Sequence, residues 1–373
     1  MNTYKVLHII GKGDVGGITS VVYNYAKFID KSKIQFDIAC VTNDKIGEYG
    51  NKFKALGCNV YKLPFKSESY KKYKQELTKL IITNKYDAIH SHAGTDAYLT
   101  LKVAKKLKVP QRIIHTHSSF QTSNLNIVIR KLTGKLLNPI FANTFIACGK
   151  LAGEKTFGKS FLYKKDSFIL PNAVDTNTYY FDKNKRNELR KKLNLTNKYV
   201  VGFAGRLAFP KNALYAVKLM QEIHNKIPNA SLLIAGDGED KKTLEAYISN
   251  WDMSNYVKIL GFYNDMKSLY QAFDILIMPS KYEGFPLVAA EAMSCGLPIV
   301  LSSSITNELN FGSQVYYINL KDRDKWVDKI CNLNNFNQRE NTQHELKSNG
   351  YDIKDVVCKL ENIYLNFGEL LKV

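Results

Sequence analysis

Short apolar runs and longer periodic stretches alternate along this chain. Continuous apolar runs of about four to eight residues are typical of buried parallel strands, and apolar residues that return every three or four positions are typical of the covering helices. This alternation predicts an α/β fold built on doubly wound parallel sheets. In the first half of the chain the expected strands are 5–10, 35–41, 59–63, 88–91, 112–116 and 145–148.

The same pattern starts again after a polar connection at 184–197. A new strand begins at Tyr199 and runs into a glycine turn at Gly205, and further strands are expected at 231–235, 257–260 and 275–278. A chain of 373 residues is long enough for two or three domains that each bury a core. We therefore expect two Rossmann-like domains and a final amphipathic helical segment, at 1–180, 181–350 and 351–373.

The stretch from 274 to 300 carries the clearest chemical signal. Its apolar strand stops at Pro279, and the helical run that follows is terminated by Gly296. Ligands of open parallel sheets bind just beyond the carboxyl ends of the strands. Because the first amides of a helix have no partner within it, those of Leu287 and Val288 would suit an anionic group such as a diphosphate.

Two glutamates bracket this helix start. Glu283 lies on the turn before the helix, and Glu291 lies eight residues later, about two helical turns on. The pair spans a length comparable to that of a nucleotide sugar. One carboxylate would therefore reach sugar hydroxyls, and the other a ribose.

Composition limits the class of protein. Hydrophobic residues make up 45% of the chain and charged residues 23%, as in an ordinary globular protein. The six cysteines are scattered, with no C-x2-C pair and no zinc-ligand spacing, which predicts reduced thiols in the cytoplasm. We expect no signal peptide and no transmembrane segment, because no apolar run is long enough.

The charge of the chain is unevenly distributed. The net charge is +19, and residues 1–175 hold 28 Lys and Arg against 12 Asp and Glu, whereas the remainder is close to balance. This asymmetry predicts an anionic partner for the first domain, which would be a phospholipid surface, a pyrophosphate-linked acceptor or nucleic acid. A lysine-rich surface that is merely solvated would look the same.

A glycine loop follows the first strand and opens an alternative interpretation. Gly11, Gly13 and Gly16 satisfy the dinucleotide-binding pattern G-x-G-x-x-G between a strand and a helix. An NAD(P)-dependent oxidoreductase is therefore one alternative, although Asp44 is displaced from the position expected of a ribose-binding acid. A basic, non-catalytic nucleic-acid-binding protein is another, although no motif of interleaved aromatic and basic residues supports it.

Two expected strands end in histidine pairs, His90-x-His92 and His115-x-His117. Carboxyl ends of strands face the ligand side of such a fold. We therefore take His115 first and His92 second as candidate functional residues. We also expect the two side chains of each pair to point to opposite faces of the sheet, which would make neither pair a natural chelate for a metal.

The segment 122–141 has a helical stripe of apolar residues with basic residues beside it. Such a segment would suit a membrane interface. A helix of a Rossmann-like domain also needs one apolar stripe for the core, and core packing is our expectation. Gly134 would weaken this helix, and Asn138-Pro139 would end it.

The segment 283–291, EGFPLVAAE, resembles the E-x7-E signature of retaining glycosyltransferases with the GT-B fold, family 4 in particular. The resemblance covers nearly the whole chain. It implies two Rossmann-like domains with a central cleft and a C-terminal helix that crosses back to the first domain. It also implies an enzyme that binds a nucleotide sugar and needs neither a metal nor a cofactor.

The resemblance implies a role for each residue of this motif. Glu283 would contact the donor sugar and Glu291 the ribose hydroxyls, while the backbone between them would take the phosphates. The donor-binding residues of the motif are then Gly284, Phe285, Pro286, Leu287, Val288 and Glu291.

Other segments resemble the same family. Arg206 and Lys211, in GRLAFPKN, would hold the diphosphate and stabilise it as it leaves. With Glu283 and with His115, which would orient the sugar, they form the expected catalytic set. Further donor-binding candidates are Gly16, Gly17, Gly205, Gly261 and Phe262, and the remaining cleft candidates are His92 and, in the segment PNAVD, Asn172. The family usually has glycine where this chain has Ala173 and Asn212.

With these features, the resemblance implies a retaining hexosyltransferase. It would move a sugar from a nucleoside diphosphate sugar, expected to be a UDP-sugar, to a saccharide acceptor on a lipid pyrophosphate. The expected setting is capsule or exopolysaccharide synthesis, and the expected place is the cytoplasm, at the inner face of the cell membrane.

Overall fold

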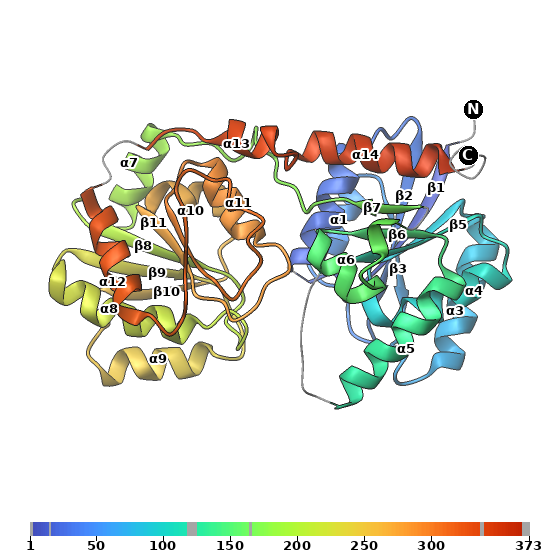
Figure 1. Cartoon of the computed structure of the whole chain (residues 1–373), viewed down its shortest axis with the longest axis horizontal. Helices are drawn as coiled ribbons and strands as arrows, with labels where there is room; N and C mark the ends of the chain where they lie inside the picture. Colours follow the sequence, from blue (N-terminus) through green and yellow to red (C-terminus); the bar gives the residue numbers. More distant parts are fainter. Residues whose placement is uncertain (1–2, 15, 118–124, 164–165, 336–338, 368–373) are drawn as a thin grey trace. The chain divides into compact units, whose positions relative to one another are not determined.

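The computed structural model describes residues 3–14, 16–117, 125–163, 166–335 and 339–367. The chain divides into two compact units (Figure 1). Unit 1 comprises Met1–Ala173 and Ile353–Val373, and unit 2 comprises Val174–Asp352. No helix in the described ranges combines the length and the apolar character that crossing a membrane requires.

Unit 1 is built on a seven-stranded parallel sheet. Its strands are β1 (Tyr4–Ile10), β2 (Ile34–Val41), β3 (Asn59–Leu63), β4 (Ala88–Ser91), β5 (Gln111–Thr116), β6 (Thr144–Ala147) and β7 (Ser167–Ile169). The order β3-β2-β1-β4-β5-β6-β7 reverses direction between β1 and β4. The helices of this unit are α1 (Gly17–Phe28), α2 (Tyr49–Ala55), α3 (Tyr70–Asn84), α4 (Ala97–Lys106), α5 (Leu125–Phe141), α6 (Lys150–Phe157) and α14 (Ile353–Leu365).

Unit 2 is built on a six-stranded parallel sheet. Its strands are β8 (Tyr199–Ala204), β9 (Ala230–Ala235), β10 (Val257–Gly261), β11 (Ile275–Met278), β12 (Ile299–Ser302) and β13 (Val315–Ile318). The order β10-β9-β8-β11-β12-β13 reverses between β8 and β11. The helices are α7 (Lys183–Lys192), α8 (Ala213–Lys226), α9 (Lys241–Asn250), α10 (Met266–Ala272), α11 (Leu287–Ser294), α12 (Arg323–Asn332) and α13 (Gln343–Ser348). The predicted α/β class with two parallel sheets is confirmed.

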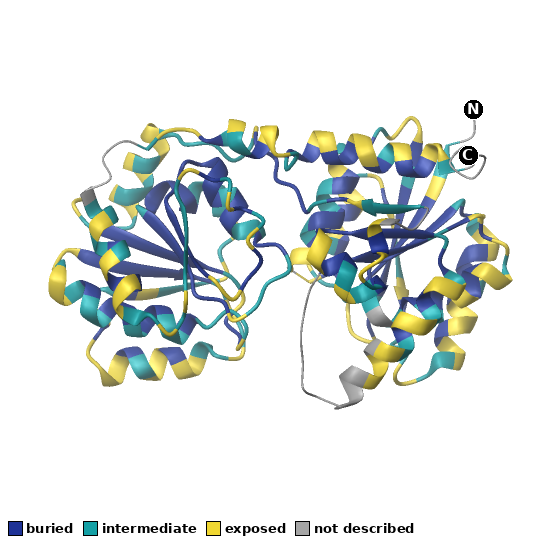
Figure 2. Cartoon of the chain, viewed as in Figure 1, coloured by how far each residue is buried: buried dark blue, intermediate teal, exposed yellow. Residues whose placement is uncertain are grey.

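The central strands form because helices cover both of their faces. Every residue of β8 and of β11 is buried (Figure 2). One core cluster of unit 2 contains Leu276, and another contains Ile275 and Ile277, so successive residues of β11 point into opposite cores. A strand in this position must be apolar throughout, which is why its continuous apolar run could be recognised.

The C-terminal helix α14 belongs to unit 1, as the resemblance implied. It packs against α1, and its side chains of Val356, Leu360 and Tyr364 are buried. The side-chain amide of Gln111, at the start of β5, donates a hydrogen bond to the Ile363 carbonyl at 2.9 Å. The last helix therefore completes the core that the first 173 residues begin.

The helix α5 departs from two expectations. It continues through Asn138 and Pro139 to Phe141 instead of ending there. Four of the apolar residues in the predicted stripe, Leu132 and Leu136 among them, lie exposed instead of packing into the core, whereas Phe141 at the end of the helix packs against it. Residues 122–124 of the predicted segment lie outside the described ranges.

Five buried histidines lie side by side on one face of the unit 1 sheet, where β1, β4 and β5 are neighbours. The expectation that each pair would occupy opposite faces was wrong, because residues two apart in a strand point to the same face. His90 and His92 stack with ring centroids 4.3 Å apart, and His115 and His117 stack at 4.0 Å. His8 lies opposite His90 in the register of β1 and β4.

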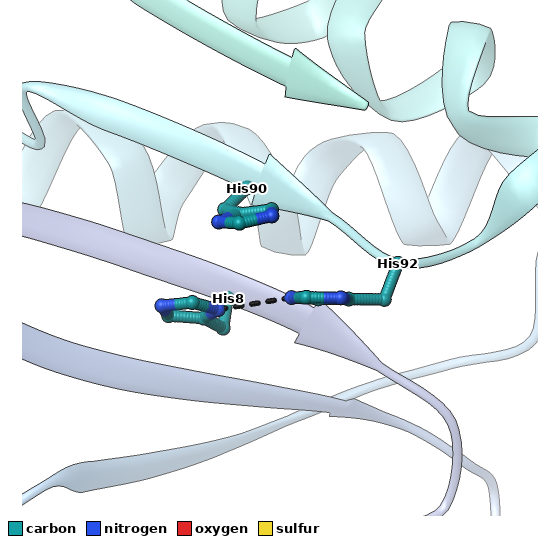
Figure 3. A group of neighbouring side chains, drawn as sticks. All are labelled: His8, His90 and His92. Carbon is teal, nitrogen blue, oxygen red and sulfur yellow. Dashed lines mark hydrogen bonds between the residues drawn. The ribbon is translucent and has the colours of Figure 1, made fainter. Parts of the chain in front are cut away.

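The ring nitrogens of these histidines form one hydrogen-bonded chain. His117 Nδ1 lies 3.1 Å from Asn172 Oδ1, and this nitrogen carries the proton, because an amide oxygen can only accept. His117 Nε2 must then accept from His92 Nδ1, at 2.7 Å. By the same logic His92 Nε2 accepts from His8 Nδ1, at 3.0 Å (Figure 3).

Tyr364 of α14 continues this chain to the other two rings. Its hydroxyl donates to His8 Nε2 at 3.4 Å and accepts from His90 Nδ1 at 2.6 Å. His90 Nε2 accepts from His115 Nδ1 at 3.2 Å, which leaves His115 Nε2 without a hydrogen-bond partner among the described residues. This pattern is that of five neutral rings, each with its proton on Nδ1, and the chain ties the C-terminal helix to three strands.

The histidine rings are stacked and do not form a chelate, although ring nitrogens lie within 4.8 Å of one another in two groups, His8 with His90 and His92, and His92 with His115 and His117. Figure 3 shows the His90 ring above the plane in which His8 and His92 meet end to end. The ring planes of His90 and His92 differ by only 16°. Because nitrogen lone pairs lie in the ring planes, stacked rings do not direct them at a common point. The arrangement serves hydrogen bonding.

Burial sets the protonation state of these rings. It lowers the pKa of His8 to about 3 and that of His117 to about 4. The pKa values of His90, His92 and His115 also lie well below the ordinary value, first because of burial and then because of the neighbouring rings. A proton added to this chain would be a charge in an apolar interior, which is costly.

We expect unit 1 to lose stability as the pH falls below about 6.5. Unfolded histidines take up protons near that pH, whereas the folded unit keeps His8 and His117 neutral down to about 3 and about 4. The unfolded state then binds more protons, so the free energy of unfolding falls by about 1.4 kcal/mol per pH unit for each such histidine. Hydrogen exchange of peptides from β1, β4 and β5, between about pH 8 and about pH 5, measures this fall.

Unit 2 serves as the internal control for this measurement, since its described histidines, His224 and His344, are half-buried and exposed. The variant His8→Phe should reduce the steepness of the fall even if it lowers stability at neutral pH, and His344→Gln should not. If the stability of unit 1 fell no more steeply with falling pH than that of unit 2, this would contradict the statement that the buried histidines are neutral.

Candidate functional site

The loops after β8 and β11 carry most of the residues that the sequence singled out in unit 2. The sheet order reverses between these two strands, so the helices that follow them cover opposite faces of the sheet. The loop of β8 runs from Gly205 to Asn212, and the loop of β11 from Pro279 to Pro286. This is the position at which open parallel sheets bind their ligands.

Backbone hydrogen bonds join the glycine turns at this edge of the sheet. The Gly205 amide donates to the Ala235 carbonyl at 3.0 Å, and the Gly236 amide donates to the Gly261 carbonyl at 2.8 Å. At Gly236 an added Cβ would lie 1.9 Å from the Gly205 carbonyl oxygen. Glycine at this position is therefore required for the turns after β8 and β9 to touch.

Asn212 performs the backbone role of the glycine that the family usually has at this position. It adopts a left-handed conformation with a φ of 57°, which asparagine tolerates better than most residues. Its side-chain amide donates to the Pro279 carbonyl at 3.0 Å. The substitution therefore keeps the shape of the turn before α8 and adds a bond to the loop of β11.

Lys211 and Glu283 meet across these two loops. The Lys211 ammonium contacts the Glu283 carboxylate, and both side chains are largely shielded from solvent, with 23% and 14% exposed. The Ser280 hydroxyl also donates to Glu283 Oε1, at 3.1 Å. A carboxylate that can accept from hydroxyls and an ammonium that can donate to a phosphate therefore lie at one point.

Arg206 is held apart from this pair. Its side chain is 74% exposed and forms an ion pair with Glu239 at 3.2 Å. The sequence led us to expect Arg206 and Lys211 to point at one place, whereas here they pair with different acids. Since exposed ion pairs contribute about 0 to 1 kcal/mol, Arg206 can leave Glu239 at small cost when an anion is near.

The helix α11 begins where it was predicted, directly after Pro286. The Leu287 amide donates to the Phe285 carbonyl at 3.0 Å, so this amide has a partner in the present conformation. The Phe285 ring is buried and stacks on Tyr351 with centroids 5.1 Å apart. Phe285 therefore anchors the turn, and the backbone from Gly284 onward is what the turn can offer to an anion.

Glu291 lies on the first turns of α11 in poorly solvated surroundings. The Tyr270 hydroxyl donates to Glu291 Oε2 at 2.8 Å. Burial raises the pKa of Glu291 to about 7, although the hydrogen bond from Tyr270 opposes this shift. The carboxyl group therefore changes its protonation state close to neutral pH, which makes it a candidate for pH-dependent binding.

The turn after β10 places an aromatic ring at the same edge of the unit 2 sheet. Gly261 has a φ of 70°, and the Phe262 side chain that follows is 46% exposed. An exposed ring beside a glycine backbone is suited to stacking against a flat heterocycle. Both residues lie where the sequence predicted them, on the loop next to the turn after β9.

In unit 1, Gly16 and Gly17 stand at the start of α1. A Cβ added at either position would meet nothing within 4 Å. Packing within the chain therefore does not require glycine at either position, and both leave backbone accessible to an approaching group. Asp44, the displaced ribose-binding acid of the dinucleotide interpretation, forms an ion pair with Lys12 at 3.4 Å.

The histidine candidates belong to the hydrogen-bonded chain described above. His115 lies within β5, and its side chain is fully buried. His117 follows the end of that strand. It is 9% exposed to solvent, and its ring forms a hydrogen bond with Asn172. His117 is therefore better placed for a ligand than His115 is. The signal that could have identified it is the strand end at Thr116, one residue before it.

Sequence reasoning missed three residues that hold the candidates in place. Ser280 bonds Glu283, Tyr270 bonds Glu291, and His8 bonds His92. The position of Ser280 directly behind a buried strand was a usable signal. Tyr270 and His8 lie 21 and 84 residues from their partners, and no local pattern connects such pairs.

Comparison with known proteins identifies both units. The family model described as Glycosyltransferase Family 4 matches residues 15–178, and the model described as Glycosyl transferases group 1 matches residues 185–352. The chain is 27% identical to EpsF of Bacillus subtilis (strain 168) over 96% of each chain. It is 29% identical to the UDP-Gal:alpha-D-GlcNAc-diphosphoundecaprenol alpha-1,3-galactosyltransferase of Escherichia coli over 78% of each chain.

A solved structure supports the fold. The crystal structure of Anabaena Alr3699/HepE in complex with UDP-glucose matches with a TM-score of 0.76 and 17% identity, over 99% of each chain. The two parallel sheets, the two family matches and this likeness agree. The chain therefore belongs to the GT-B glycosyltransferases of the family 4 type, enzymes that transfer a sugar from a nucleotide sugar.

Proposed function

We propose that this glycosyltransferase moves a hexose from a UDP-sugar, with retention at the anomeric carbon, to a saccharide carried on a lipid pyrophosphate. The product would serve surface polysaccharide synthesis, in a capsule or exopolysaccharide. Unit 2 would bind the donor, and unit 1 would supply the acceptor side. No metal or cofactor takes part in this scheme.

The contact between Lys211 and Glu283 carries the proposal. The hydroxyls of a hexose and the phosphate to which it is bonded are adjacent in a nucleotide sugar. To hold a ligand through both groups, a protein needs a hydrogen-bond acceptor and a cation side by side, at the edge where a parallel sheet binds ligands. The backbone at the start of α11 and an Arg206 released from Glu239 would add further donors to the diphosphate.

The chemical step follows from this arrangement. As the bond between C1 and the diphosphate oxygen breaks, the acceptor oxygen bonds C1 on the same face, and its proton passes to the departing diphosphate. Lys211 and Arg206 would stabilise the negative charge that accumulates on the leaving group. Glu283 would hold the sugar by its hydroxyls, and a histidine of unit 1 would orient it, with His117 better exposed for this role than His115.

Two relatives support a uridine nucleotide. The name of the Escherichia coli enzyme states a UDP-Gal donor, and the Anabaena protein was crystallised with UDP-glucose. In this chain the ribose would be held by Glu291, and the uracil would lie against the backbone of Gly261 and the ring of Phe262. Gly16 and Gly17 would let the donor phosphates approach the backbone of unit 1.

The acceptor is proposed on two grounds. The name of the Escherichia coli relative specifies an acceptor sugar on diphosphoundecaprenol. The basic excess of this chain lies in the first 175 residues, as binding a pyrophosphate at a membrane surface would require. The six free cysteines suit a reducing compartment, and we place the enzyme at the cytoplasmic face of the membrane.

Membership of the glycosyltransferase family removes the basis of the other interpretations. The loop of Gly11, Gly13 and Gly16 needs no nicotinamide cofactor to explain it, because family 4 also has a glycine loop at this position. The basic surface of unit 1 has a use in pyrophosphate binding, which makes a nucleic acid unnecessary.

We expect Glu283→Gln to lower the rate of sugar transfer at least about 100-fold, because a neutral amide is a weaker acceptor for the sugar hydroxyls than a carboxylate and cannot form the ion pair with Lys211. Release of UDP and formation of glycosylated product measure the rate, and circular dichroism checks the fold. Glu245→Gln, on the exposed side of α9, is the matched control and should retain full activity. Transfer by Glu283→Gln within about threefold of the unaltered rate would reject the role.

We expect UDP-glucose to bind more weakly as the pH falls below about 7. The Glu291 carboxyl has its pKa raised to about 7 by burial, so it is ionised above this pH and neutral below it. A neutral carboxyl is the poorer acceptor for ribose hydroxyls, and the dissociation constant should rise by up to about tenfold per pH unit. Isothermal titration with UDP-glucose, whose diphosphate does not titrate in this range, measures the effect.

Two variants isolate Glu291 as the cause. Glu291→Gln should bind weakly at every pH and show no transition. Tyr270→Phe removes a hydrogen bond that lowers the pKa of Glu291, so the transition should move to higher pH. An unshifted transition in Tyr270→Phe, or one that persists in Glu291→Gln, would assign the titration to another group.

A further inference from the structure

Four large aliphatic side chains of α5 are more than half exposed: Ile129 at 52%, Leu132 at 58%, Leu136 at 72% and Ile140 at 53%. Their spacing of three, four and four residues places them along one face of the helix. We call these four residues the α5 stripe. Exposed apolar residues scattered singly need no explanation, whereas a continuous row of this kind marks an interaction surface.

The opposite face of α5 holds the helix on unit 1. Gly134 and Asn138, one turn apart, are buried, and the Asn138 side-chain amide reaches the Gly94 carbonyl at 3.4 Å. The helix packs against α4, and Lys105 of α4 donates to the Ile140 carbonyl at 2.9 Å. Small and polar residues therefore face the protein while large aliphatic residues face outward, which reverses the arrangement of an ordinary surface helix.

Positive charge surrounds the α5 stripe. Residues 97–153 contain nine Lys and Arg and no Asp or Glu. Arg130 is paired with Asp96, but Lys102, Lys105 and Lys106 of the adjacent α4 and Lys135 of α5 are exposed. Aliphatic residues on one face with lysine and arginine beside them are the features of a helix that lies in the surface of an anionic membrane.

A protein partner fits this surface less well. Interfaces between proteins are enriched in tyrosine and tryptophan and depleted in lysine, particularly toward their centre. The α5 stripe contains only leucine and isoleucine, and lysine is the commonest charged residue around it. Lipid chains make no demand for specific hydrogen bonds, whereas anionic headgroups favour lysine.

We propose that α5 is the surface by which this enzyme docks on an anionic phospholipid membrane, with the α5 stripe at the boundary of the acyl chains and the surrounding lysines at the headgroups. This inference rests on the proposed function, because an acceptor carried on a lipid pyrophosphate must be reached at a membrane surface. It adds the part of unit 1 that makes the contact and the class of lipid that it recognises.

Vesicle flotation of the full chain tests the docking surface. We expect binding to phosphatidylcholine vesicles with about 30% phosphatidylglycerol, and much weaker binding to phosphatidylcholine alone. The double variant Leu132→Gln and Leu136→Gln should weaken binding about 100-fold, because each leucine moved out of water contributes roughly tenfold. The matched control, Ile82→Gln with Leu365→Gln, alters two exposed residues on α3 and α14 and should bind as the unaltered chain does.

The headgroup contribution is tested separately. Lys102→Gln with Lys106→Gln should reduce binding to the anionic vesicles by about fivefold per lysine and leave the weak binding to neutral vesicles unchanged. We call the double variant Leu132→Gln, Leu136→Gln the leucine variant. If it bound anionic vesicles as the unaltered chain does, or if its control lost as much vesicle binding, the assignment of the docking surface to α5 would be overturned. The assignment would also be overturned if the unaltered chain did not bind anionic vesicles but formed dimers in solution, and the variant with Leu132→Gln and Leu136→Gln did not form them. The α5 stripe would then serve self-association.

Titration with UDP-glucose separates this inference from the proposed function. The leucine variant should bind UDP-glucose as the unaltered chain does, which also shows that it is folded. If the unaltered chain binds vesicles through α5 but does not bind UDP-glucose, the docking surface stands and the proposed donor falls. If it binds UDP-glucose but not vesicles, the donor stands and the docking surface falls.

Discussion

The reversal of strand order in a parallel sheet is the constraint on which this structure depends. At the reversal, the loops of two neighbouring strands leave toward helices on opposite faces and remain available for a ligand. In unit 2 the reversal lies between β8 and β11, and the ion pair of Lys211 with Glu283 joins the loops that follow these strands. In unit 1 it lies between β1 and β4, the strands that carry His8 and His90.

The two reversals are used in different ways. In unit 2, Lys211 and Glu283 at the reversal pair with each other and are only partly exposed, whereas Arg206 is exposed and pairs with Glu239. In unit 1, the histidines are buried, and all but one of their ring nitrogens serve in a chain that ends at Asn172. Tyr364 is part of this chain, so α14 is linked through His8 and His92 to the ring of His117. A buried polar network of this kind specifies one arrangement of its elements, because any other leaves donors unpaired.

The surface of unit 1 differs from its interior in charge. The core excludes charge so strongly that five histidines stay neutral, while the adjacent helices α4 and α5 concentrate positive charge outside. On α5 this charge accompanies large aliphatic residues that no other part of the described unit covers. A protein that works on an acceptor held in a membrane has a use for such a surface, since binding the lipid raises the concentration of the acceptor around it.

The sequence alone determined the strands and the donor motif of this protein. The strands at 59–63, 88–91 and 275–278 have the predicted bounds, and 275–278 could be recognised because a strand buried along its whole length on both faces must be apolar throughout. Glu283 and Glu291 were recognised because a strand, a turn and a helix start are contiguous in the chain. Only the tertiary structure decided what each group contacts. Lys211 and Glu283 lie 72 residues apart, His90 and Tyr364 lie 274 apart, and the face of α5 that is buried depends on what α4 presents to it. Such contacts are made by the folded sheet, and no local pattern encodes them.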